Sequence, residues 1–125
     1  GEETITDYIY QGFSPSRHII KLYREKLDRL GAVPSDRLTE RASGSRVLVA
    51  GYMVCLQMPP TAKGRFSFIT LEDEYGLINL VIRPEVYKAY RTVIRLEPLL
   101  LVEGIVEKKN SLINIKANRI ESLAR

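Results

Sequence analysis

The feature that most constrains the fold of this chain is a change of hydrophobic period after Gly44. Before Gly44, apolar residues recur at three- and four-residue steps, as on one face of a helix. After it, short segments rich in β-branched residues alternate polar and apolar side chains, as in strands with one buried face. The sequence therefore predicts two parts, a helical linker over residues 1–45 and a β domain over residues 46–125.

Five strands are predicted in the second part. Gly51 marks a sharp bend in the first of them. Pro59 and Pro60 cannot continue a strand, so residues 57–64 are expected to form a long loop. A tight turn is predicted at residues 73–76, where a glycine can adopt positive φ, and another between the last two strands. The predicted strands cover residues 46–56, 65–72, 77–83, 99–108 and 112–122.

One helix interrupts the strands, between the third and the fourth. It is predicted over residues 85–96, with Pro84 at its first position and Val86, Tyr90, Val93 and Ile94 on one face. An SH3-like barrel would lack this helix, and a sandwich would need more strands. The order β-β-β-α-β-β is that of the oligonucleotide-binding (OB) fold, a partly open Greek-key barrel. The expected fold class is therefore mainly β, a five-stranded OB-fold barrel preceded by a short α-helical linker segment.

The amino-terminal segment contains one predicted amphipathic helix over residues 16–30, ended by Gly31. A second short helical turn is expected at residues 34–42, followed by a flexible joint at residues 43–45. This segment lacks a core of its own, so we expect it to pack against the barrel or against another domain. The apolar face of the helix is predicted to comprise Ile19, Leu22, Tyr23, Leu27 and Leu30.

The distribution of charge indicates an anionic ligand. The formal net charge is +4. Seven basic and seven acidic residues precede Arg46, whereas twelve basic and eight acidic residues follow from Arg46 onward. The whole excess therefore lies in the predicted barrel, which favours a polyanion such as nucleic acid. A mildly basic solvated surface is the alternative, and charge alone does not decide between them.

Other kinds of site are not predicted. One cysteine, Cys55, and one histidine, His18, cannot supply a structural zinc site, so no metal or cofactor is expected. No phosphate-binding glycine-rich loop or Ser/His/Asp set is present, and the acidic residues 72–74 are interpreted as turn chemistry, so no catalytic residue is predicted. Since no apolar segment approaches about 20 residues and the start lacks a signal-peptide pattern, we expect a cytoplasmic protein without membrane contact.

Ligands of the OB fold cross the face made by the second and third strands. The alternation of side chains places Phe66 and Phe68 outward on the second strand, with Asn79 and Arg83 outward on the third. Aromatic rings stack bases, an amide can hydrogen-bond a base edge, and a guanidinium can hold a phosphate or stack. The alternative is that the two rings pack beneath the first loop or against the amino-terminal helices.

The loops that flank this face add cations at both ends. Lys63 and Arg65 belong to the first loop, and Lys108 and Lys109 to the last hairpin. Cations in these positions would bind phosphates and make the affinity fall as salt rises. For the two hairpin lysines the alternative is a solvated turn. The acidic residues 72–74 are expected to repel phosphate and to bound the binding face.

Several short motifs are specific enough to resemble a known family. They are residues 49–51, 57–64 (QMPPTAKG), 68–76 (FITLEDEYG), 79–81, 99–104 (LLLVEG) and 115–117, with Asp7-Tyr8, Gly12-Phe13-Ser14 and Ser16-Arg17-His18 as the preceding linker. Together they resemble the OB domain of bacterial C-family DNA polymerases, the α subunits of DNA polymerase III, above all the error-prone branch. Two positions depart from the family pattern, Ile19 for a proline and Met58 for a basic residue, and the second removes a cation from the first loop.

The resemblance implies a non-catalytic domain of a replicative or translesion polymerase active in DNA replication and repair. It further implies that the domain binds single-stranded template DNA near the polymerase core, contacts other replication proteins and is a nucleoid-associated monomer when isolated. The catalytic carboxylates of the DNA-directed DNA polymerase would lie far upstream. A protein-interaction barrel that docks a replication partner is the alternative of another class.

A more distant similarity concerns the anticodon-binding barrels of class II aminoacyl-tRNA synthetases. The shared pattern is Phe68, Leu71, Asp73, Gly76 and Asn79. In that family the positions that match Phe68 and Asn79 contact bases. An anticodon-type RNA-binding barrel is therefore a further alternative, and both resemblances imply the same pair of binding residues.

Overall fold

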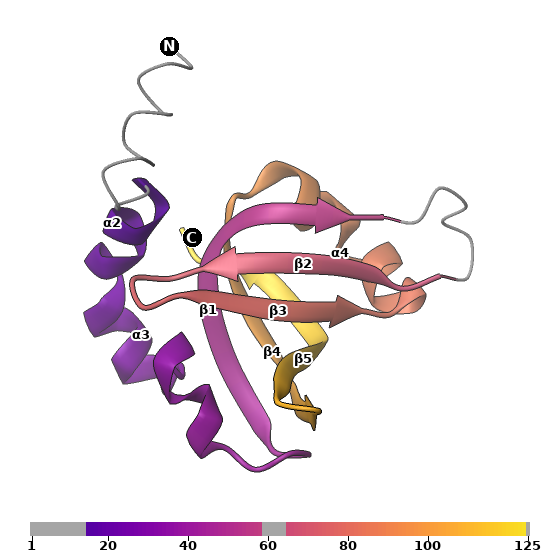
Figure 1. The fold of residues 1–125 in the computed structure, drawn as a ribbon. Coiled ribbons are helices and arrows are strands. Elements are labelled where there is room, and N and C mark those ends of the chain that lie inside the picture. The colour runs from indigo at the N-terminus through magenta and orange to yellow at the C-terminus, as the bar shows by residue number, and fades with distance from the viewer. Residues whose placement is uncertain (1–14, 59–64, 125) are drawn as a thin grey trace.

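Five strands close into a barrel in the order β1-β2-β3-β5-β4 in the computed structural model, which describes residues 15–58 and 65–124 (Figure 1). Adjacent strands are antiparallel except β3 and β5, which are parallel. The predicted β-β-β-α-β-β order is confirmed, and every strand begins and ends within two residues of its predicted bounds. The strands are β1 (Arg46–Gln57), β2 (Ser67–Glu72), β3 (Leu77–Ile82), β4 (Leu99–Lys109) and β5 (Leu112–Ser122).

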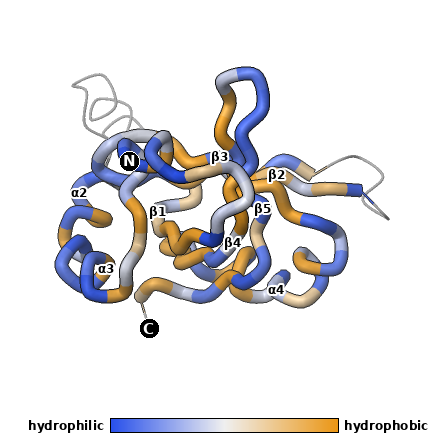
Figure 2. Tube along the Cα trace, turned by 90° about the horizontal axis from the view of Figure 1, so that it is seen from below, coloured by the Kyte–Doolittle hydropathy of each residue, from blue (hydrophilic) through white to orange (hydrophobic). Residues whose placement is uncertain are grey.

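Helix α4 (Pro84–Leu96) connects β3 to β4, as predicted. Pro84 occupies its first turn, where the missing N–H has no intrahelical partner to lose. Val86 and Ile94 are buried in the barrel core, and Tyr90 and Val93 pack against it, so the predicted apolar face is confirmed. In both views α4 lies on the side of the barrel away from the amino-terminal helices (Figures 1 and 2).

The barrel core is made by the inward side chains of all five strands. On β2 and β3 the predicted inner residues are buried, with Leu71 and Ile82 fully inaccessible. Close packing also depends on glycine: a Cβ on Gly51 would lie 2.8 Å from the Cβ of Leu71 and 2.9 Å from the carbonyl oxygen of Glu72. Only a residue without a side chain allows β1 to approach β2 this closely.

The amino-terminal segment differs from the single helix predicted over residues 16–30. It forms α2 (Pro15–Leu22) and α3 (Arg24–Leu30), because Tyr23 between them has non-helical backbone angles of φ −95° and ψ 1°. The predicted apolar face was also wrong in part, since Leu22 and Leu30 are 83% and 49% exposed, whereas Ile20 is buried. Ile20 and Leu27 pack instead with Ala50, Leu101 and Leu123 of the barrel, so tertiary contact selects the buried stripe. Figure 2 shows hydrophilic and hydrophobic residues alternating along these helices.

The chain that follows α3 packs directly on the barrel. Gly31 ends α3 with φ 82°, as predicted, and η1 (Ser35–Glu40) is the expected helical turn. Val33 and Leu38 belong to the same buried cluster as the barrel core. The predicted flexible joint at residues 43–45 is instead hydrogen-bonded to β4 through Val106 and Lys108. Division into two domains at residue 45 stays a prediction. The structure shows that residues on both sides of this boundary share one buried core.

Candidate nucleic-acid interface

The outer face of β2 and β3 carries exposed aromatic rings. Phe66 and Phe68 are 45% and 47% exposed. Neither ring is buried against the amino-terminal helices, and the alternative that they pack beneath the first loop concerns residues 59–64, which lie outside the described residues. Between the two rings Ser67 is 3% exposed, as strict alternation requires. Phe68 on β2 and Phe66 directly before it therefore offer bases two exposed rings for stacking.

Strand register aligns Phe68 with side chains of three other strands. Its paired residues are Gln57 on β1 and Val81 on β3, and Val81 is paired in turn with Lys116 on β5. Residues paired in this way project from the same face of a sheet. We call this line, Gln57, Phe68, Val81 and Lys116, the aromatic row. It places one ring and one cation on a single line across the strands.

The next line of paired residues is polar. Thr70 on β2 is paired with Cys55 on β1 and with Asn79 on β3, and Asn79 is paired with Asn114 on β5. Asn79 and Cys55 are exposed, and the other two are half-buried. We call these four residues the amide row. Its hydroxyl and two carboxamides offer both donors and acceptors to a base edge.

Arg83 follows β3 and is held against β5. Its Nη2 donates a hydrogen bond to Oδ1 of Asn118 at 2.6 Å. Its Nε is buried and has no hydrogen-bond partner among the described residues. The guanidinium is therefore a half-buried, fixed cation at the edge of the face.

The rim residues differ in their contacts. Lys63 lies outside the described residues, and Arg65 is exposed beside Phe66. Lys108 is engaged, because its Nζ donates to the carbonyl oxygen of Thr39 at 2.8 Å. Lys109 is exposed. In this structure the amine of Lys108 thus holds the last hairpin to η1.

The acidic residues of the β2–β3 turn bind the amino-terminal segment. Asp73 is fully buried, and its carboxylate accepts hydrogen bonds from the backbone and hydroxyl of Ser35 and from the backbone N–H groups of Tyr75 and Gly76. This confirms that Asp73 shapes the turn. Gly76 has φ 158°, a positive value that other residues rarely adopt, as predicted, so the glycine and the Asp73 carboxylate both shape the turn.

The two glutamates of this turn are paired with arginines. Glu72 accepts from Nε of Arg17 at 3.2 Å, and Glu74 accepts from Nε and Nη2 of Arg24 at 2.8 and 2.6 Å. Burial alone would raise the pKa of Glu74, but the hydrogen bonds and the charge of Arg24 lower it overall. The charges of Glu72 and Glu74 thus dock α2 and α3 on the turn (Figure 1). That residues 72–74 repel phosphate and bound the binding face stays a prediction.

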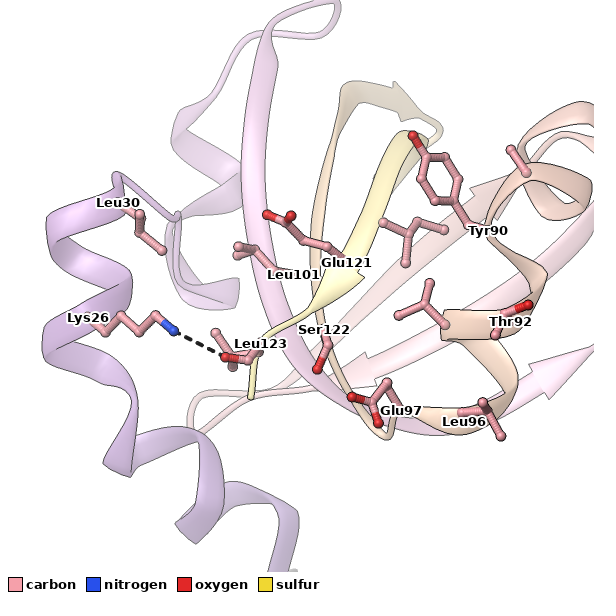
Figure 3. Close-up of a pocket in the computed structure, with 13 residues that line it drawn as sticks. Lys26, Leu30, Tyr90, Thr92, Leu96, Glu97, Leu101, Glu121, Ser122 and Leu123 are labelled. Carbon is pink, nitrogen blue, oxygen red and sulfur yellow. Dashed lines mark hydrogen bonds between the residues drawn. The ribbon is translucent and has the colours of Figure 1, made fainter. Parts of the chain in front are cut away.

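A cavity of about 610 Å³ lies elsewhere, between α3, α4 and the ends of β4 and β5 (Figure 3). Its lining is largely apolar and includes the carboxylates of Glu97 and Glu121. Its one lysine, Lys26, donates a hydrogen bond to the carbonyl oxygen of Leu123 at 3.2 Å. Two carboxylates make this cavity a poor match for a polyanion, so the outer face of β2 and β3 is the better candidate.

The described residues also bear on other kinds of function. Within residues 15–58 and 65–124 no three or more His, Cys, Asp or Glu side chains are grouped as metal ligands. In the same part of the chain no helix has the length and apolar character needed to cross a membrane.

Sequence reasoning missed the contribution of β5 to this face. Asn114, Lys116 and Asn118 alternate with the buried residues Ile115 and Ala117, so the period was visible in the sequence. What was not visible is that β5 pairs with β3 in parallel, 35 residues further along the chain. Without that register, the sequence does not show that the outward side chains of β5 lie beside those of β3.

Comparison with known proteins shows which family of domains the chain belongs to. Residues 44–123 match the family described as OB-fold nucleic acid binding domain. The chain therefore belongs to this family, and the barrel and its exposed face are those of a nucleic-acid-binding OB domain.

Two relatives similar in sequence narrow the family further. The chain is 38% identical over 124 residues to an error-prone DNA polymerase of Methylococcus capsulatus, which covers 99% of this chain and 12% of the relative. It is 40% identical over 124 residues to the error-prone DNA polymerase of Bdellovibrio bacteriovorus, with 91% of this chain and 12% of the relative covered. The resemblance to error-prone polymerases is confirmed, and the chain spans about 12% of the length of these relatives.

A solved structure extends the comparison to the fold. Asparaginyl-tRNA synthetase from Pyrococcus horikoshii, complexed with asparaginyl-adenylate, superposes with a TM-score of 0.61 at 18% identity. The match covers 74% of this chain and 22% of that one. At this identity the likeness establishes a shared OB fold.

Proposed function

We propose that the outer face of β2 and β3 binds single-stranded DNA, and that the chain serves as the template-binding OB domain of an error-prone DNA polymerase. The observation that carries the proposal is the pair of exposed rings, Phe66 and Phe68, beside Asn79 on the face that OB domains use for ligands. The names of the sequence relatives support DNA as the ligand. In this proposal polymerisation, repair and translesion synthesis belong to the parent protein, and this domain holds the strand.

The chemistry of the face suits a strand of any sequence. Each ring that stacks a base contributes about 1–3 kcal/mol, and stacking is tolerant of sequence because every base has a π-face. Arg65, Arg83 and Lys109 would supply phosphate contacts, which release counterions and make the affinity depend on salt. The predicted partner is therefore single-stranded DNA, bound with modest affinity and without strong sequence preference.

The test is fluorescence anisotropy with a labelled oligo-dT at several salt concentrations. We expect saturable binding that weakens as salt rises, and Phe68→Ala should weaken it by about 1–3 kcal/mol through the loss of a stacking ring. Leu96→Ala is the matched control, because it also truncates an exposed apolar side chain, 70% accessible, but on α4.

The outcomes separate the proposal from its alternatives. Absence of binding at millimolar protein and low salt would contradict DNA binding and favour a protein-interaction barrel. Tighter binding of a structured RNA loop than of oligo-dT would favour the anticodon-type reading. Equal affinities of the Phe68→Ala and Leu96→Ala variants would remove Phe68 from the site.

A further inference from the structure

We propose that β5 is part of the binding face and that Lys116 is its central phosphate-binding cation, with Asn114 as a second base-reading amide. This inference rests on the proposed function, and it assigns residues beyond the two strands and two loops that the sequence predicted. The face is then three strands wide, from β2 across β3 to β5, with the end of β1 at its border.

The pairing of β3 with β5 places Asn114 and Lys116 beside residues of the binding face. Asn79 is paired with Asn114, and Val81 with Lys116. The intervening residue Ile115 is fully buried and is paired with Leu80 of the core. Since side chains alternate along a strand, Asn114 and Lys116 must project on the same outer side as Asn79 and Val81.

A hydrogen bond between side chains supports the same alignment two residues further along both strands. Continuing the register by two residues brings Arg83 beside Asn118, and the hydrogen bond of 2.6 Å between these side chains joins them across the two strands. The seam between β3 and β5 is therefore closed by side chains as well as by backbone pairing. Nothing in the described part of the chain separates the two strands on this face.

The chemistry of Lys116 fits a phosphate contact. Its side chain is half-buried, and no hydrogen bond or ion pair holds its amine among the described residues, unlike that of Lys108. Lys116 and Phe68 lie two strands apart in the aromatic row, a Cα separation of about 10 Å. A base stacked on Phe68 would thus leave its backbone within reach of the long, flexible lysine side chain.

The amide row adds groups that contact bases, and its neighbour on β4 limits the face. Asn79 and Asn114 are paired neighbours, so two carboxamides can address one base edge or two successive bases. On the other side of Asn114 its paired residue is Glu107 of β4, which is exposed. Its carboxylate repels phosphate and bounds the face beyond β5.

The experiment compares Lys116→Ala with Lys88→Ala, which removes the same charge from an exposed position on α4. Binding of fluorescein-labelled dT8 is measured by anisotropy across a salt series. We expect Lys116→Ala to bind about tenfold more weakly at low salt and to reduce the slope of log K against log salt by about 0.7, the value for one phosphate contact on a single strand. Lys116→Arg should restore both, and Asn114→Ala should weaken binding several-fold while leaving the slope unchanged.

The outcomes distinguish this inference from the proposed function. If the wild type binds and responds to Phe68→Ala, but Lys116→Ala matches the wild type or Lys88→Ala, the inference about β5 is overturned and the proposed function stands. If the wild type does not bind dT8, both fail. Circular dichroism melting of each variant confirms that it is folded before its affinity is used.

Discussion

At the scale of single residues, the structure depends on ion pairs between positions far apart in the sequence. Arg24 and Glu74 are 50 residues apart, yet two hydrogen bonds join them, and the guanidinium lies 5.8 Å from the ring centre of Tyr75. Because the side chains of Arg24 and Glu74 are only 16% and 11% exposed, this pair is screened less by solvent than a fully exposed ion pair would be. Pairs of this kind cannot be predicted from a sequence without the tertiary fold.

The Arg24–Glu74 pair predicts a pH dependence of stability. The pKa of Glu74 is lowered below its ordinary value of 4.5, so between the two values the unfolded state binds more protons than the folded state. The stabilisation is therefore fully present above about pH 4.5 and is lost as pH falls through the folded pKa. Urea unfolding between pH 6 and 3 should show a shallower pH dependence for Glu74→Gln than for the wild type.

The exposed Glu121→Gln variant is the control for this measurement. It should retain the wild-type pH dependence. A Glu74→Gln curve parallel to that of the wild type through the acid range would show that the ion pair does not contribute to acid stability.

The sequence predicted those parts of the candidate site where the alternation of side chains alone determines which residues face outward. Phe66, Phe68 and Asn79 lie outward as predicted, because a period of two is a property of the strand itself. The hydrogen-bonded states of Arg83 and Lys108 were not predictable, since their partners Asn118 and Thr39 come from other elements.

At the scale of secondary structure, the strands were predicted better than the first helix. Strand bounds follow from local signals such as Pro84, Pro98 and the Asn110-Ser111 turn, whose two residues both adopt positive φ. The prediction for the helix over residues 16–30 was wrong because contact with β1 and β4 determines which of its side chains are buried. Its own sequence does not encode that contact. The same tertiary packing accompanies the break at Tyr23.

The approach of β4 to β5 gives a prediction at this scale. The register between these strands shifts between Glu103 and Gly104, and a Cβ on Gly104 would lie 2.4 Å from the carbonyl oxygen of Lys116. Gly104→Ala must therefore move backbone, at a cost of about 1–3 kcal/mol in the free energy of unfolding. Thermal or urea unfolding measures this loss, and an unchanged midpoint would show that β5 can shift freely at Lys116.

At the scale of the whole molecule, the amino-terminal segment and the barrel share one core. Leu38 of η1 is 4% exposed and packs with the barrel residues. Leu38→Ala should lower the free energy of unfolding by about 2–5 kcal/mol, the usual range for a leucine removed from a core. Arg37→Ala, at an exposed position in the same helical turn, should change it little.

The shape of the unfolding transition tests the shared core directly. Unfolding of the Leu38→Ala variant followed by far-ultraviolet circular dichroism and by tyrosine fluorescence should give coincident transitions, because segment and barrel unfold together. Two separated transitions would instead support independent units divided near residue 45.

Closure of the barrel has a consequence for contact between separate polypeptide chains. The order β1-β2-β3-β5-β4 ends with β1 hydrogen-bonded to β4, so no strand of the barrel remains as an open edge. Open edges recruit strands from neighbouring chains and promote aggregation. Closure of the folded barrel therefore limits strand addition from neighbouring chains.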